Sequence, residues 1–132
     1  MKDAAPEATR LADYTPYPFK IERVTLDFDL DPKRTRVRAQ LAIHPLGKGP
    51  MRLDGEQLTL VSIRIDPEDE LSPALDPAAY TLDASSLTLH APPERPFILE
   101  TTVEISPEDN TALSGLYMSG GRFCTQCEAE GF

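Results

Sequence analysis

The feature that most constrains the fold is a strict alternation of apolar and polar residues in the first third of the chain. Apolar side chains occupy every second position from Val24 to Leu30, with polar side chains between them. A period of two places successive side chains on opposite faces of an extended backbone, so the pattern predicts a half-buried β-strand. The Asp-Pro-Lys-Arg sequence at 31–34 is typical of a four-residue hairpin loop, and a second alternating strand follows it.

Charge predicts the register of this first hairpin. A loop at 31–34 brings opposite charges together on one face and apolar side chains together on the other. The expected pairs are Asp29 with Arg36, Asp27 with Arg38, Phe28 with Val37, and Leu26 with Ala39. The two faces agree on one register, and we expect the apolar face to be buried.

Further short segments with the same period follow along the chain. We expect strands over Leu58–Ile65, Tyr80–Leu82, Leu87–Leu89 and Phe97–Ile105, and a polar break at 48–52. The parity of the apolar positions changes between Leu60 and Ile63, which predicts a β-bulge. No long amphipathic helix is indicated before residue 107. The fold class expected is therefore all-β, an antiparallel sandwich or saddle-like sheet of short strands.

Charge and hydropathy disfavour several classes of partner. The chain of 132 residues has 13 Lys plus Arg against 22 Asp plus Glu, a net charge of −9. A negative surface disfavours binding to nucleic acid or to an anionic membrane. No apolar run approaches the ~18 residues of a membrane span, and no apolar targeting segment is seen among the first ten residues. We expect no nucleic acid, no membrane and a cytoplasmic location.

The spacing of the cysteine and histidine residues predicts no metal site in the sequence. Cys124 and Cys127 form one Cys-x-x-Cys pair, which is half of a zinc ribbon, and no second pair exists. His44 and His90 lie far apart without the spacing of metal ligands. The default expectation is two reduced thiols and no metal.

The last stretch, 110–132, departs from the strand pattern. Glycines interrupt its periodicity, and we expect an irregular glycine-rich loop that ends the fold. Gln126, Glu128 and Glu130 alternate and would share one face of an extended chain. From the residues alone they are either surface groups or polar groups positioned by the loop. The expected domain organisation is an irregular leader at 1–18 and one β domain at 19–132, incomplete at its C-terminal end.

Several segments of the chain closely resemble bacterial aminopeptidase N, a family of zinc metallo-aminopeptidases of the gluzincin type. The strongest segments are Asn110–Leu113, Gly115–Tyr117, Ser119–Gly120 and Cys124–Phe132. Weaker similarity is found at 27–31, 53–62 and 104–107, so the resemblance extends from about Asp13 to the end. It implies the N-terminal domain of an enzyme that hydrolyses N-terminal residues from peptides.

The resemblance also implies roles for individual residues. By position, Gln126 and Glu128 correspond to the pair that binds the substrate's free α-amine, and peptide N-termini are the expected partners. Glu130 is expected to make a structural hydrogen bond, and Cys124 and Cys127 are not implied to bind zinc. A carboxylate and an amide oxygen suit a protonated amine that has left water.

The chain departs from the family pattern in lacking its catalytic motifs. No His-Glu-x-x-His or Gly-x-Met-Glu-Asn segment is present. We therefore expect no catalytic residue, metal ligand or cofactor within these residues, and an inactive fragment. The one zinc ion of the full-length enzyme, and the catalytic domain that would be this segment's partner, are expected in a part of the protein outside them.

An all-β chain of this composition also fits functions other than peptide hydrolysis. A stand-alone β-sandwich that docks proteins through exposed strand edges is the main alternative, and edge-strand self-association of the fragment is expected if strands are missing. A sugar-binding sandwich is disfavoured, because the chain has no Trp and 7% aromatic residues. A reading frame that continues into His-Glu-x-x-His would favour the peptidase over the docking module.

Overall fold

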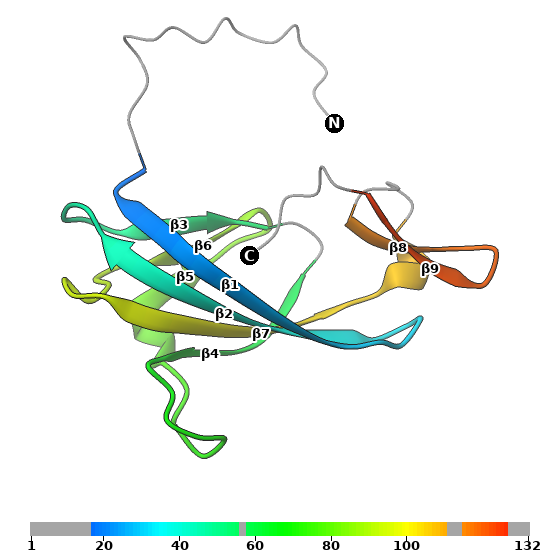
Figure 1. Cartoon of the computed structure of the whole chain (residues 1–132), viewed down its shortest axis with the longest axis horizontal. Helices are drawn as coiled ribbons and strands as arrows, with labels where there is room; N and C mark the ends of the chain where they lie inside the picture. Colours follow the sequence, from blue (N-terminus) through cyan, green and yellow to red (C-terminus); the bar gives the residue numbers. More distant parts are fainter. Residues whose placement is uncertain (1–16, 56–57, 111–114, 127–132) are drawn as a thin grey trace, which may run out of the picture.

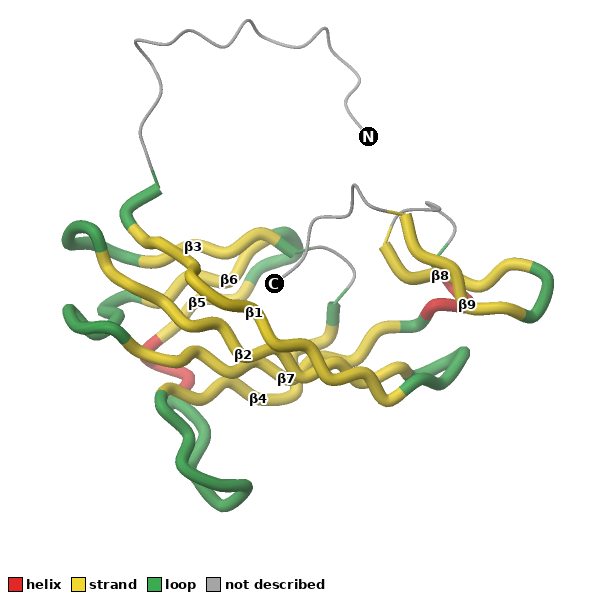
Figure 2. Tube along the Cα trace, in the orientation of Figure 1, coloured by secondary structure: helices red, strands yellow, loops and turns green. Residues whose placement is uncertain are grey.

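The computed structural model describes residues 17–55, 58–110 and 115–126, and these confirm the all-β, antiparallel class (Figures 1 and 2). One sheet has the order β1-β2-β7-β4, a second has the order β3-β6-β5, and β8 pairs with β9. The strands are β1 (Phe19–Asp29), β2 (Thr35–Pro45), β3 (Met51–Asp54), β4 (Thr59–Ile65), β5 (Tyr80–Leu82), β6 (Ser86–Leu89), β7 (Phe97–Ile105), β8 (Gly115–Ser119) and β9 (Arg122–Gln126). Two 3-10 turns, η2 (Pro77–Ala79) and η3 (Pro107–Asp109), join them.

The first hairpin has the predicted register. The observed pairs include Asp29 with Arg36, Asp27 with Arg38, Phe28 with Val37, and Leu26 with Ala39. Asp31 closes the loop, because its Oδ1 accepts hydrogen bonds from the backbone N–H groups of Lys33 at 2.9 Å and Arg34 at 3.1 Å. This local turn chemistry is what the sequence at 31–34 specifies.

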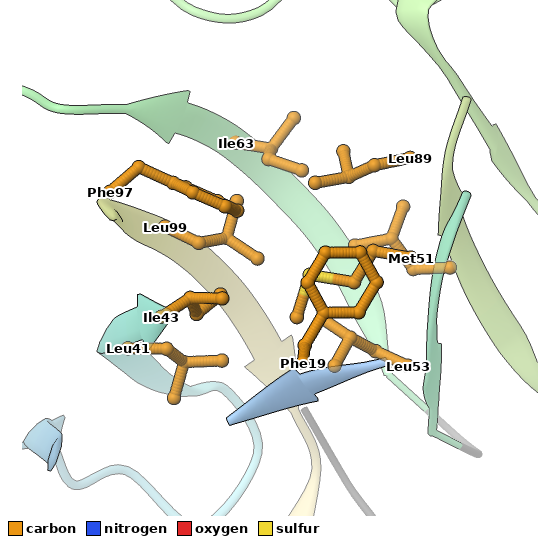
Figure 3. Packing of buried hydrophobic residues seen from close by; sticks show 10 residues of the cluster. Phe19, Leu41, Ile43, Met51, Leu53, Ile63, Leu89, Phe97 and Leu99 are labelled. Carbon is orange, nitrogen blue, oxygen red and sulfur yellow. The ribbon is translucent and has the colours of Figure 1, made fainter. Parts of the chain in front are cut away.

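The hydrophobic core lies between the two sheets (Figure 3). Its buried members are Phe19, Leu41, Ile43, Met51, Leu53, Ile63, Leu87, Leu89, Phe97 and Leu99. The first sheet contributes the end where β2 finishes and β7 begins, and the second sheet covers that end. Two antiparallel sheets, each apolar on its inner face, exclude water from the layer between them.

The predicted burial of the apolar face of β1 is wrong. Leu26 and Phe28 were expected to lie in the core, but both are about half exposed, although their partners on β2 are buried. The register of the hairpin and the face on which these side chains lie are as predicted. The difference is that no second layer packs over them. The second sheet does not extend over β1 beyond Phe19, so the rest of this edge strand has no layer packed on it.

Other strand predictions are confirmed, but β3 was not predicted. The bulge in β4 is seen as a register shift between Leu60 and Ser62. The strands expected at Tyr80–Leu82 and Leu87–Leu89 are found as β5 and β6, which pair with each other. The polar break predicted at 48–52 is wrong at its end, where β3 begins with the fully buried Met51. A strand of four residues has only two inward positions, which is too few to show a period.

The irregular glycine-rich loop predicted for 110–132 is in part a regular hairpin. Ser119 pairs with Arg122, so Gly120 and Gly121 alone form the turn between β8 and β9. Both have positive φ, 58° and 77°. A two-residue hairpin turn of this kind requires positive φ at both central positions, which glycine adopts without strain.

Candidate functional site

The hairpin β8–β9 carries the first of the predicted site residues. Gln126 is the last residue of β9, and its Cα lies opposite that of Gly115. Glu128 lies outside the described residues, as do Glu130 and Cys127. The proposed amine-binding pair therefore begins where this hairpin ends.

The base of the hairpin is tied to the first sheet. Asn110 follows η3, and its Nδ2 donates a hydrogen bond to the carbonyl of Leu116 at 2.8 Å. Within η3, Pro107 is buried, and the N–H of Glu108 donates to the carbonyl of Pro32 at 2.8 Å. The turn η3 thus connects the end of β7, the loop of the first hairpin and β8 (Figure 2). These contacts hold the stem from which the predicted site segment continues.

Cys124 and His90 contact other protein groups in the part of the chain that the structure describes. Cys124 lies on β9, and its Sγ is 3.8 Å from the carbonyl oxygen of Arg122. The His90 ring is held by the Ala78 carbonyl at 3.1 Å and the Thr81 hydroxyl at 2.6 Å. A carbonyl only accepts, so Nδ1 of His90 is the donor there. Within ranges 17–55, 58–110 and 115–126, no three His, Cys, Asp or Glu side chains are grouped to bind a metal ion.

A buried ion pair on the outer face of the first sheet was not singled out from the sequence. Arg64 on β4 lies opposite Glu100 on β7, and its Nε donates to Oε1 of Glu100 at 2.8 Å. Gln40 on β2 donates to the other oxygen at 2.9 Å. Their side chains are 10% and 2% exposed for the arginine and the glutamate. The sequence shows only that Arg64 and Glu100 have opposite charges and occupy polar positions of two expected strands. It does not show that these two strands pair.

The environment of Glu100 has opposing effects on its acidity. Burial raises its pKa, whereas hydrogen bonds from Gln40 and Arg64 and the positive charge of the guanidinium lower it, and the net shift of the pKa is downward. Arg64 also donates to the Asp69 carbonyl at 2.9 Å. The cluster therefore fixes the 66–76 loop on the sheet, which is a structural role.

A shallow depression of about 540 Å³ lies beside this pair on the same outer face. Charged side chains from β1, β2 and β4 line much of it, and Glu70 reaches it from the loop. Arg36 pairs with Glu104 at 2.9 Å, and Arg38 with Glu70 at 2.8 Å. The arginines of the depression are thus already compensated by carboxylates, so we assign the depression to the solvated face of the sheet.

Among the described residues, no helix has the length and apolar character that a membrane-spanning helix needs.

The fold is similar to a β-rich part of an aminopeptidase of known structure. A solved structure of Legionella pneumophila aminopeptidase A, in complex with aspartic acid, superposes with a TM-score of 0.77 at 30% identity. The match covers 93% of this chain and 14% of that one. No protein-family model matches the sequence.

Sequence relatives identify the particular protein to which the chain is similar. It is 52% identical over 134 residues to aminopeptidase N of Caulobacter vibrioides, across 100% of this chain. It is 43% identical over 129 residues to that of Escherichia coli, and 39% identical over 124 residues to that of Haemophilus influenzae. These confirm the resemblance to aminopeptidase N. The chain spans only 15%, 14% and 14% of the length of these relatives.

Proposed function

We propose that the chain is the N-terminal β domain of a longer zinc aminopeptidase and helps to anchor the free α-amine of a peptide. The observation that carries the proposal is the 52% identity to an aminopeptidase N along the entire chain. The matched region covers the entire chain and so includes the segment containing Gln126 and Glu128. The Legionella enzyme was solved with aspartic acid, a molecule with an unblocked α-amine, which is consistent with the proposal.

The chemistry of the two residues suits this role. A protonated amine that enters a closed site loses its hydration, and a carboxylate compensates for that loss through a charge-assisted hydrogen bond. Glu128 would supply the carboxylate and Gln126 an amide oxygen as a second acceptor. A peptide with a blocked or internal amine lacks the charge, so such a site selects for exopeptidase action. The hairpin β8–β9 gives the segment a fixed stem, because Asn110 and η3 hold its base.

The residues present do not fit a zinc site. The sequence has two histidines and no His-Glu-x-x-His motif, and the described residues group no three metal-binding side chains. The zinc ion and the hydrolytic step are therefore proposed for a part of the full-length protein outside these 132 residues. A cytoplasmic location and a role in peptide catabolism are part of the same proposal.

The test is a substitution of Glu128 by glutamine in the full-length protein. Hydrolysis of an aminoacyl anilide should lose about 10–100-fold in kcat/KM, mainly through KM, because a hydrogen bond to a charged group is worth about 1.5–3 kcal/mol. Steady-state kinetics measure this.

The matched control is Glu108→Gln. Glu108 is an exposed carboxylate on η3, outside the proposed site, and this variant should keep wild-type constants. Unchanged KM and kcat in the Glu128 variant would remove Glu128 from the substrate site.

A further inference from the structure

The apolar face of β1 stands half open beside a buried core. Val24, Leu26 and Phe28 on β1, and Leu30 directly after its last residue, occupy alternate positions and are between 50% and 54% exposed. Their neighbours on β2, on the same face of the sheet, are nearly inaccessible: Val37, Ala39 and Leu41 are between 2% and 9% exposed. Beyond Phe19, the layer that covers the inner face of the sheet therefore stops at β2 and does not reach β1.

The opposite edge strand of the same sheet, β4, is covered by the core. On β4, Ile63 is 1% exposed, and Leu60 and Ile65 pack against the core cluster. Both edges thus carry apolar residues toward the inner face, but only the β4 edge is covered. Figure 1 shows β1 as the outermost strand of the first sheet, with its long axis running away from the second sheet.

Exposed edge strands are commonly protected by proline, by lysine, by a β-bulge or by charges that point toward the apolar side. The bulge of β1 lies at its N-terminal end, between Ile21 and Arg23, and the stretch from Val24 to Leu30 has no such protection. Between Val24 and Leu30 there is no proline, and the charged residues Asp27 and Asp29 alternate with the apolar row and so lie on the other face. A continuous apolar row of this kind marks a surface that another element covers.

We infer that the apolar row of β1 is the docking surface for a segment of the same polypeptide that lies outside these 132 residues. The inference rests on the proposed function, since it requires a longer protein. The chain spans 14% to 15% of relatives that match it along nearly its full length, so most of such a protein would lie outside it. That remainder would be permanently tethered to β1, which raises its effective concentration at this surface.

A second copy of the chain is the weaker candidate. Edge-to-edge pairing of two β1 strands would extend the sheet and satisfy backbone groups, but it would add no layer over the apolar side chains. Each copy also carries a net charge of −9, which opposes self-association. Covering the row requires an apolar segment stacked on the sheet face.

Hydroxyl-radical footprinting of the wild-type full-length protein tests the inference without a substitution. Oxidation of Leu26 and Phe28 is compared with that of Leu71, which is 90% exposed on the 66–76 loop, each normalised to its rate in urea. We expect at least tenfold protection of the two β1 residues relative to Leu71, unchanged across a hundredfold range of protein concentration. Protection no greater than the exposed fractions of 50%, 51% and 90% already give would overturn the inference. Protection that appears only at high concentration would also overturn it and assign the surface to a second copy.

A paired substitution gives an independent readout. Leu26→Asp places a charge in the proposed interface and should lower the Tm of the full-length protein, whereas Leu71→Asp should leave it unchanged. Equal Tm values for the two variants would contradict the inference. A full-length mass near 14.6 kDa would overturn the proposed function itself, whereas free oxidation of β1 in a longer protein would overturn only the docking surface.

Discussion

At the residue scale, the buried Arg64–Glu100 pair shows how polar groups stabilise the outer face of the sheet. Both side chains are removed from water, and each is compensated by the other and by additional hydrogen bonds. The attraction within such a pair does little more than offset its desolvation. Removing one partner is costly because it leaves the other charge buried without compensation.

The substitution Glu100→Gln should therefore lower the free energy of unfolding by about 3 kcal/mol. Urea denaturation of the 132-residue chain at neutral pH measures the loss. Glu70→Gln is the matched control: it breaks a pair with Arg38 in which the carboxylate is 73% exposed, and it should cost less than about 1 kcal/mol. Equal losses in the two variants would show that burial adds nothing to the Glu100 pair.

The acidity of Glu100 predicts a dependence of stability on pH. Its pKa is lower in the folded protein than in the unfolded chain, where a glutamate titrates near about 4.3. The stabilisation is therefore complete above that value and is lost as the pH falls through the lower folded pKa. The stability difference between wild type and Glu100→Gln should be constant from pH 7 to about 5.5 and shrink below about pH 4.3. Denaturation series at several pH values would show this, and a difference that grows on acidification would contradict it.

At the scale of elements, short turns determine both hairpins that matter for the fold and the candidate site. Asp31 sets the first turn through two hydrogen bonds to backbone N–H groups. Gly120 and Gly121 set the second through their positive φ angles. No atom lies within 4 Å of a Cβ built on either glycine, so backbone conformation, and not space, is what restricts these positions.

Gly120→Val should loosen the hairpin β8–β9. A β-branched side chain at φ 58° is strained by about 1–2 kcal/mol, which corresponds to roughly 5–30-fold faster amide exchange from opened states of the hairpin. Hydrogen exchange of the β8 and β9 amides measures this. Gly120→Asn is the control, because asparagine tolerates the left-handed region and should exchange near the wild-type rate. Equal exchange in both variants would mean that the turn conformation does not limit the opening.

At the scale of the whole molecule, the hydrophobic core is covered on both sides except along the edge strand β1, where apolar side chains are half exposed. The second sheet closes over β2, β7 and β4, and the row along β1 extends past it. The open apolar edge and the predicted site segment that begins at the end of β9 both accord with the proposal that the chain is part of a longer protein.

The pure, zinc-loaded 132-residue chain should accordingly hydrolyse no aminoacyl anilide. It has no His-Glu-x-x-His motif to hold the metal beside a substrate. A chromogenic assay at high protein concentration measures this, with the full-length protein as the positive control. Turnover above the buffer rate, retained after repurification, would contradict the assignment of the catalytic site to another part of the protein.

Much of the strand layout was predictable because its causes are local. The pairing of Asp29 with Arg36 follows from a four-residue loop and two alternating patterns, and the bulge near Leu60 follows from a change of parity. The strand β3 was missed because Met51 and Leu53 alone do not reveal a period. The hairpin β8–β9 was missed because paired glycines were read as an interruption, although they also favour a tight turn.

The candidate site was predictable only as a resemblance. Gln126 and Glu128 stand in a motif similar to that of aminopeptidase N, but nothing in their spacing distinguishes them from surface groups. The relation of Arg64 to Glu100 could not be predicted either, because it depends on the pairing of β4 with β7, which are separated by a loop and a hairpin.

The sequence by itself determined which residues share a face, because alternation and turn chemistry act between near neighbours in the chain. Only the tertiary structure decided which part of each face is buried. Burial depends on whether a second layer lies above a strand, and that layer is built from β3, β5 and β6, which are distant in sequence from β1. For this reason Leu26 and Ala39 pair as predicted, yet one is half exposed and the other is buried.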